Sequence, residues 1–203
     1  MTKPLPRRFY TRETLTVAEE LLGKQLVRLT SEGNLMGRIA EVEAYRGSDD
    51  PGSHAYRGVT PRNRLMFGKG GFSYVYFIYG MHYCFNVVTE KQNVPGAVLI
   101  RALEPTSGIE IMRKNRGNRN VCDLTNGPAK LAQALSITTE QSGLDLTRGE
   151  ELFISEPRVQ ESFEVASTRR IGIEAGVDSQ WRFYIRKSEF VSSKKTRAQN
   201  NYP

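Results

Sequence analysis

Residues 72–89 have the sequence FSYVYFIYGMHYCFNVVT, in which two apolar runs flank a single glycine. Alternating aromatic and β-branched residues on both sides of Gly80 are typical of two strands joined by a tight turn. We therefore expect a β-hairpin, with strands at 72–78 and 83–89 and a turn at 79–82. The same type of pattern predicts further strands at 25–29, 36–45, 97–103, 151–154, 169–173 and 181–186.

Helix signals are fewer and lie between the predicted strands. Thr16 and Glu19 have the spacing of a capping box, which predicts a short helix that ends at Gly23. A second helix is expected over 107–115, where a serine is followed three residues later by glutamate. A third is expected over 129–135, after the start signal NGP at 126–128, because proline is favoured near the first position of a helix.

The chain has 203 residues, 38% of them hydrophobic and 25% charged, which is enough for one sizeable core. Strands outnumber helices and several are linked as hairpins. The sequence therefore predicts an α+β fold, a single compact domain over residues 1–191 on a mainly antiparallel sheet with flanking helices. Residues 192–203 are polar and basic, and a disordered C-terminal tail is expected there.

Charge and cysteine content limit the possible partners and compartments. Lys and Arg number 29 against 22 Asp and Glu, a net charge of +7 that favours a polyanionic partner, nucleic acid before membrane. Basic residues recur at 57–64 and 113–119, either as solvated faces or as phosphate contacts. No apolar run is long enough for a membrane span and no secretory signal is visible. Cys84 and Cys122 are expected to be reduced thiols in the cytoplasm or nucleus of the cell.

The sequence offers little for a metal or a nucleotide cofactor. Two His and two Cys, without a CxxC or HxxxH spacing, are too few ligands for a dedicated zinc site. Neither a phosphate-binding loop motif nor a dinucleotide-binding glycine motif is present. We expect no metal and no cofactor.

Residues 38–45, RIAEVEAY, alternate in the manner of a strand. Side chains two residues apart share a face of a strand, so Ile39, Glu41 and Glu43 are expected to point the same way. Carboxylates on such a face require a cation, and the candidates are Arg101, inside the apolar run 97–103, and Arg38. Two explanations stay open: a structural ion pair, or a glutamate general base whose attacking water the arginine holds.

Aromatic residues are concentrated in the middle of the chain. Ten of the 19 lie between Tyr45 and Phe85. They form either a packed core or a pocket for a flat ligand, and the tyrosine hydroxyls favour the pocket because each needs a hydrogen-bond partner. His54 lies in the long irregular stretch 46–64, and loops of that length are usually functional.

A longer series of motifs resembles a known family. In chain order, the motifs are AEVEAY at 40–45, His54, TPRNR at 60–64, MF at 66–67, YVYFIYGM at 74–81, CxN at 84–86, LIRALEP at 99–105, NGPAKL at 126–131, RIGI at 170–173 and RFYI at 182–185. This series resembles the alkyladenine (3-methyladenine) DNA glycosylases, the monofunctional enzymes that remove alkylated purines and hypoxanthine from DNA. The resemblance extends from about residue 9 to residue 191.

The resemblance implies a compact α+β fold around a curved antiparallel sheet, with a hairpin that inserts into the minor groove of DNA. Glu43 matches the general base of the family. Arg101 and the main-chain carbonyl of Ile171 match the groups that hold the attacking water. Tyr45, His54 and Tyr76 match the walls of the base pocket.

Asn86 matches the side chain that crowds the exocyclic amine of guanine. Tyr79 matches the residue that fills the gap left by the flipped nucleotide, with Met81 beside it. Arg62 and Lys130 lie in matching motifs and are expected to contact DNA. The segment KGGF at 69–72 differs from what is expected in vertebrate members of the family, and the loop at 45–63 is shorter by about one residue; both changes flank the pocket.

The implied activity is hydrolysis of the N-glycosidic bond of 3-methyladenine, 7-methylguanine, hypoxanthine or ethenoadenine by a Glu-activated water, the first step of base excision repair. No lyase activity is expected, since no lysine is needed for a Schiff base. The implied partner is damaged duplex DNA and the implied state a monomer, in the cytoplasm near the nucleoid of a prokaryote or in the nucleus of a eukaryote. Two alternatives remain: a non-catalytic nucleic-acid-binding module, which would not need Glu43, and a nucleoside hydrolase, which would not need the net charge or an exposed Tyr79.

Overall fold

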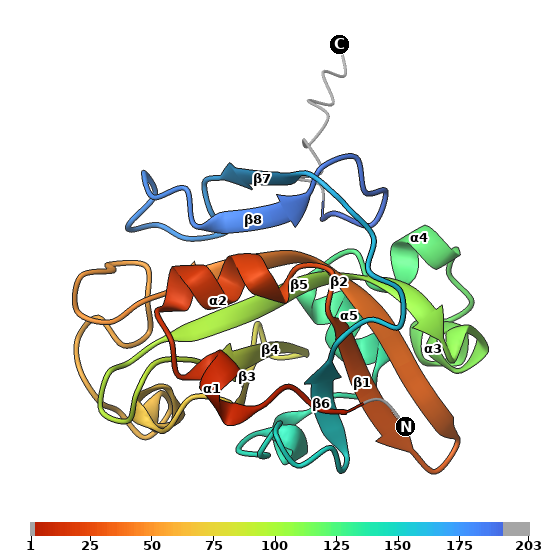
Figure 1. Ribbon diagram of the computed structural model, residues 1–203, viewed down its shortest axis with the longest axis horizontal. Helices are drawn as coiled ribbons and strands as arrows, with labels where there is room; N and C mark the ends of the chain where they lie inside the picture. Colours follow the sequence, from red (N-terminus) through yellow and green to blue (C-terminus); the bar gives the residue numbers. More distant parts are fainter. Residues whose placement is uncertain (1–2, 193–203) are drawn as a thin grey trace.

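The computed structural model describes residues 3–192, and a curved antiparallel sheet forms its centre (Figure 1). Six strands follow the order β3-β4-β5-β2-β1-β6, and β8 pairs with both β2 and β7. The α+β prediction is confirmed. The strands are β1 Gln25–Thr30, β2 Gly33–Tyr45, β3 Ser73–Ile78, β4 His82–Val88, β5 Ala97–Ser107, β6 Leu152–Ser155, β7 Val165–Thr168 and β8 Arg182–Ile185.

Short helices lie around this sheet. Helix α2 packs against β2 and β5, and α5 packs against β4 and β5. The main core gathers apolar side chains from both helices and from the strands between them. The helices are α1 Arg7–Tyr10, α2 Thr14–Leu21, α3 Ile109–Arg116, α4 Val121–Leu124 and α5 Pro128–Ala134, with 3₁₀ turns η1 Arg64–Phe67 and η2 Thr139–Gln141.

Two helix starts differ from the prediction. The N-cap of α2 is Glu13, whose side chain accepts a hydrogen bond from the backbone N–H of Thr16 at 2.9 Å, so the helix begins before the predicted capping box. Strand β5 continues to Ser107, where a helix was expected to start. The chain turns at Gly108, which has a left-handed φ of 73°, and α3 follows it.

The long strand β2 supports the rest of the sheet. It pairs with β5 along most of its length, with β1 in its first half, and with β8 at 41–43. The expected strict alternation is wrong at Ala40, because the register against β5 shifts between Ile39 and Glu41. Such a bulge turns the following side chains. Ile39 therefore packs in the main core together with Val42, apart from the two glutamates.

The β7–β8 hairpin, blue in Figure 1, lies against the C-terminal half of β2. The strand predicted at 169–173 is wrong, because β7 occupies 165–168 and the chain is irregular from 169 to 181. In this irregular stretch the backbone N–H of Ile171 donates to the carboxylate of Glu43 instead of to a neighbouring strand. None of the helices within residues 3–192 combines the length and apolar character needed to cross a bilayer.

Candidate active site

A cavity of about 560 Å³ opens between the β3–β4 hairpin, the loop after β2 and the irregular stretch before β8. This volume lies in the range of small-molecule sites. The residues expected to form the pocket meet here, although they come from four separate segments of the chain. Those that line the cavity are Tyr45, His54, Tyr76, Tyr79, Asn86 and Ile171.

Glu43 lies immediately behind the cavity wall, and its side chain is fully buried. Its Oε1 accepts the backbone N–H of Ile171 at 2.7 Å, and its Oε2 accepts the hydroxyl of Tyr45 at 2.7 Å. Arg101 Nη1 lies 3.1 Å from the same Oε2. These three donors compensate a buried charge that would otherwise be costly. A carboxylate oxygen can accept at least two hydrogen bonds, and Oε1 accepts only one here, so it can still accept one from a water.

Arg101 bridges the two carboxylates of β2. Its Nε donates to Glu41 Oε1 at 2.9 Å, while Nη1 faces Glu43. The ion pair considered from the sequence is therefore present, and it involves both glutamates rather than one. Ile171 was expected to contribute its carbonyl; in the structure its N–H holds the carboxylate.

The rings of Tyr74 and Tyr76 and the imidazole of His54 lie together in the cavity lining. His54 lies 4.7 Å from Tyr76 between ring centroids, edge to face, and its Nδ1 lies 3.0 Å from the hydroxyl of Tyr74. Tyr74 was not singled out from the sequence, although its position two residues before Tyr76 places both rings on one face of β3. The guanidinium of Arg62 lies 5.1 Å from the centre of the Tyr76 ring.

Burial and neighbouring charges shift the pKa values of the imidazole and of the phenols that line the cavity. His54 is exposed overall, but burial of its inner edge lowers its pKa, and the charge of Arg62 lowers it further. The imidazole is therefore neutral at pH 7. Burial also raises the pKa of Tyr45 and of Tyr76, so both phenols stay protonated and can donate hydrogen bonds.

Asn86 and Cys84, on β4, complete the cavity floor. The amide nitrogen of Asn86 donates to the carbonyl of Tyr74 at 3.0 Å and to that of Cys84 at 3.3 Å, which fixes the side chain. Cys84 is a free, buried thiol, and burial raises its pKa. From the sequence, Cys84 served as an indicator of compartment and as the first residue of the CxN motif, without a role in the site.

The tip of the β3–β4 hairpin carries exposed apolar side chains at the mouth of the cavity. Tyr79 is 81% exposed and Met81 70%. Tyr79 and Gly80 both have positive φ, 53° and 68°, as in the primed turns that join two-stranded hairpins. An ordinary core role for Tyr79, the simpler explanation from the sequence, is incompatible with this exposure.

Residues 8–189 match the family model described as "Methylpurine-DNA glycosylase (MPG)". The chain belongs to the methylpurine-DNA glycosylase family. It is 50% identical over 190 residues to a protein of Carboxydothermus hydrogenoformans named "Putative 3-methyladenine DNA glycosylase", an alignment that covers 94% of this chain and 99% of the relative. Proteins of the same name from Clostridium acetobutylicum (48% identical, 93% and 97% covered) and Desulfitobacterium hafniense (47% identical, 95% and 100% covered) are also similar.

The chain is thus a DNA glycosylase of the 3-methyladenine type, and DNA is its substrate. The expected family resemblance is confirmed, and the non-catalytic binding module and the nucleoside hydrolase are set aside. Among residues 3–192 of the glycosylase, no three His, Cys, Asp or Glu side chains are grouped to hold a metal ion.

Arg170 is a residue of the glycosylase site for which the sequence indicated no role. It forms a buried two-pronged ion pair with Asp50, at 2.7 and 2.6 Å, and donates to the carbonyl of Ala44 at 3.0 Å. Its guanidinium lies 4.7 Å from the ring centre of Tyr45. Arg170 therefore supports Tyr45 and places its neighbour, Ile171, beside the carboxylate.

The glycosylase has other cationic side chains near the cavity. Lys130, on α5, is half-buried and donates to Asn126 at 2.6 Å. The first turn of α5 lines the cavity through Pro128 and Ala129, so Lys130 follows directly on the cavity edge. Ser192, expected at the start of the basic tail, is instead buried against Glu41; the rest of that predicted tail, 193–203, lies outside the described residues.

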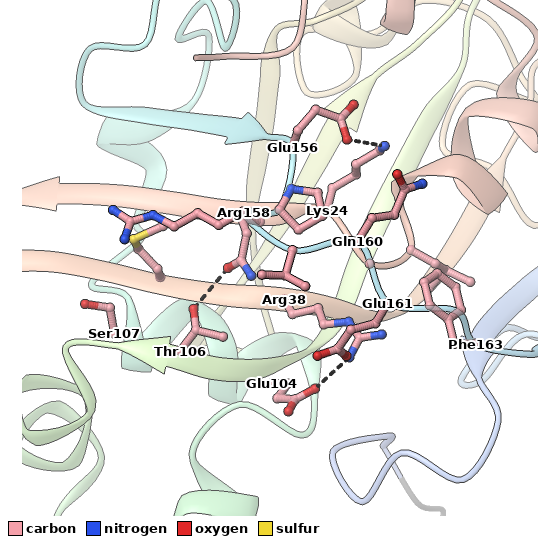
Figure 2. Close-up of a pocket in the computed structure, with 16 residues that line it drawn as sticks. Lys24, Arg38, Glu104, Thr106, Ser107, Glu156, Arg158, Gln160, Glu161 and Phe163 are labelled. Atoms are coloured by element: carbon pink, nitrogen blue, oxygen red, sulfur yellow. Dashed lines mark hydrogen bonds and ion pairs between the residues drawn. The ribbon is translucent and has the colours of Figure 1, made fainter. Parts of the chain in front are cut away.

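A second cleft of the glycosylase, about 470 Å³, lies between β1, β2, β5 and the segment 156–163 (Figure 2). Its charges neutralise each other, since Lys24 pairs with Glu156 at 2.7 Å and Arg38 with Glu161 at 2.7 Å. It contains none of the residues expected in the active site. The chemistry is therefore assigned to the aromatic cavity.

Proposed function

We propose that this glycosylase removes alkylated or deaminated purines, of the 3-methyladenine, 7-methylguanine, hypoxanthine and ethenoadenine class, from duplex DNA by hydrolysis of the N-glycosidic bond. The observation that carries the proposal is the carboxylate of Glu43. It lies behind an aromatic cavity, held by Tyr45, Arg101 and the N–H of Ile171.

Access to the damaged base requires that the nucleotide leaves the helix. A base inside a duplex cannot reach a cavity, and rotating it out costs a few kcal/mol of stacking and pairing. Tyr79, exposed at the hairpin tip beside the cavity, has the position of a side chain that fills the vacated space. The net charge of +7 supports binding to the phosphate backbone.

The aromatic cavity suits a cationic purine. Alkylation at a ring nitrogen gives the base a positive charge, which stacks favourably on tyrosine faces. For 3-methyladenine and 7-methylguanine the same charge makes the base a good leaving group, so no protein acid has to protonate it. Hypoxanthine and ethenoadenine are neutral in the nucleotide, so they leave as anions that take up a proton from water. His54, neutral at pH 7, adds no opposing charge to this wall.

Hydrolysis needs one base and one water. Glu43 takes a proton from the water while the water oxygen bonds to C1′ of the sugar. The bond between C1′ and the purine nitrogen breaks, and its electron pair leaves with the base. The ionised carboxylate also stabilises the oxocarbenium-like transition state. Glu43 is fully buried under Tyr45 and Ile171 in the free protein, so these two residues must shift when the nucleotide enters for a water to reach the open hydrogen-bond position of Oε1.

The test is base release from duplex oligonucleotides that each carry one lesion, followed by alkaline cleavage at abasic sites. We expect release of at least one of the four bases and no strand cleavage before alkali. Glu43→Gln should bind lesion DNA but release no base, whereas Glu151→Gln, at a remote ion pair with Arg28, should behave as wild type. Undiminished excision by Glu43→Gln would contradict the mechanism, and strand cleavage without alkali would contradict the monofunctional assignment.

A further inference from the structure

Glu41 is a buried carboxylate that the mechanism does not use. Its side chain is fully buried, and it does not line the aromatic cavity. Its Oε1 accepts hydrogen bonds from Arg101 Nε at 2.9 Å and from Arg182 Nε at 2.6 Å. Ser192 completes the set, with its hydroxyl on Oε1 at 2.7 Å and its N–H on Oε2 at 2.6 Å.

As a result, the three guanidinium nitrogens of Arg101 contact three different residues. Nε is committed to Glu41, only Nη1 reaches Glu43, and Nη2 donates to the hydroxyl of Ser192 at 3.3 Å. An arginine and a carboxylate without other partners frequently form a two-pronged pair, in which two N–H groups of the guanidinium donate to the two carboxylate oxygens. Glu41 and Ser192 prevent that arrangement by holding the other edges of the guanidinium.

The charges of this network balance. Two carboxylates, Glu41 and Glu43, face two arginines, Arg101 and Arg182, and all four side chains are largely buried. If the charge of Glu41 is removed, Glu43 becomes the sole buried anion for Arg101. Closer pairing then makes Glu43 a weaker proton acceptor, because a nearby opposite charge favours its charged form.

We propose that Glu41 and Ser192 are positioning residues that keep Arg101 from pairing with both oxygens of Glu43, and so preserve the basicity of Glu43 and the remaining hydrogen-bond position of its Oε1 for water. The inference rests on the proposed role of Glu43 as the base. It also gives a function to the C-terminal end of the described residues, where Ser192 contacts Glu41 beside the pairing of β8 with β2. The carbonyl of Ser192 fixes that end further by accepting from Arg182 Nη2 at 3.3 Å.

The first experiment measures single-turnover excision and lesion-DNA affinity of the full-length Glu41→Gln variant as a function of pH. We expect the maximal rate to fall at least about tenfold, with the dissociation constant for lesion DNA changed less than about threefold. The acidic limb of the rate profile should move to lower pH, a shift that loss of packing alone does not produce. Glu41→Asp, which keeps the charge, should recover part of the rate.

The second experiment protects the test against a folding defect in Glu41→Gln. Ser192→Ala should lower the rate about threefold, with a pH shift in the same direction. Its matched control is Ser155→Ala, because Ser155 is also buried but its hydroxyl has no hydrogen-bond partner among the described residues. A folded Glu41→Gln or Ser192→Ala with a wild-type rate and profile would overturn the inference. Inactive wild-type protein would instead count against the proposed function.

Discussion

Replacing Tyr79 by serine tests the role of the hairpin tip, because the structure separates its effect on stability from its effect on activity. Tyr79 is 81% exposed, so only about a fifth of its surface is removed from water. A fully buried aromatic side chain covers 150–250 Å². One fifth is about 40 Å², which at about 25 cal/mol per Å² gives at most about 1 kcal/mol of unfolding free energy. For a chain of this size that lowers Tm by about 2–4 °C.

The expected loss of activity is larger than this small loss of stability. The flipped state loses a stacking partner worth about 1–3 kcal/mol, which corresponds to a fall of about fivefold to 150-fold. The loss should be greatest for a lesion in a well-paired duplex and smallest opposite a mismatch, where less pairing must be broken. The assay is single-turnover excision on both duplexes, together with thermal melting of the protein.

Two control variants make the result interpretable. Tyr74→Ser removes a ring that is only 2% exposed and should cost about 3–5 kcal/mol of unfolding free energy. Val159→Ser removes an apolar side chain that is 72% exposed and lies on the other cleft, so it should change neither measurement. A large fall in Tm for Tyr79→Ser, with equal excision on matched and mismatched duplexes, would refute the assignment.

Three further predictions follow from the ion pairs, the imidazole and the charge. Asp50→Asn leaves Arg170 unpaired in the interior and should lower the free energy of unfolding, measured in denaturant melts, by about 3–5 kcal/mol. The control Asp49→Asn, at a surface pair with Arg46, should lower it by less than about 1 kcal/mol, and equal losses would contradict the structure. Burial lowers the pKa of His54 below its ordinary value of 6.5, so the imidazole is neutral from pH 9 to 7 and release of 7-methylguanine should not change over that range on account of His54. The rate should fall only at more acid pH, where the charged ring repels the cationic base; a fall that begins at pH 8 and that His54→Gln abolishes would show that the pKa is raised instead. Binding to lesion DNA should weaken with a log–log salt slope of about −0.9 per phosphate contact, and Arg62→Gln should reduce that slope by about one; an unchanged slope would remove Arg62 from the interface.

Local sequence patterns were sufficient to predict the β3–β4 hairpin, the buried ion pair of Arg101 and the family. The alternation on both sides of Gly80 predicted the β3–β4 hairpin almost to the residue, because a strand period and a tight turn depend on neighbours in the chain. The isolated arginine of β5 predicted a carboxylate partner, because a buried charge requires one. The motif series then identified the family that the comparisons confirm.

The tertiary structure alone decided how these parts combine. Periodicity cannot show that β8 pairs with β2, or that Ser192 contacts Glu41 across 151 residues, because such pairing depends on long-range contacts. The bulge at Ala40 separates Ile39 from the glutamates, and it depends on the register with β5 rather than on the sequence of β2. The N–H of Ile171 reaches Glu43 because Arg170 is held by Asp50, an interaction between buried charges that only the folded chain brings together.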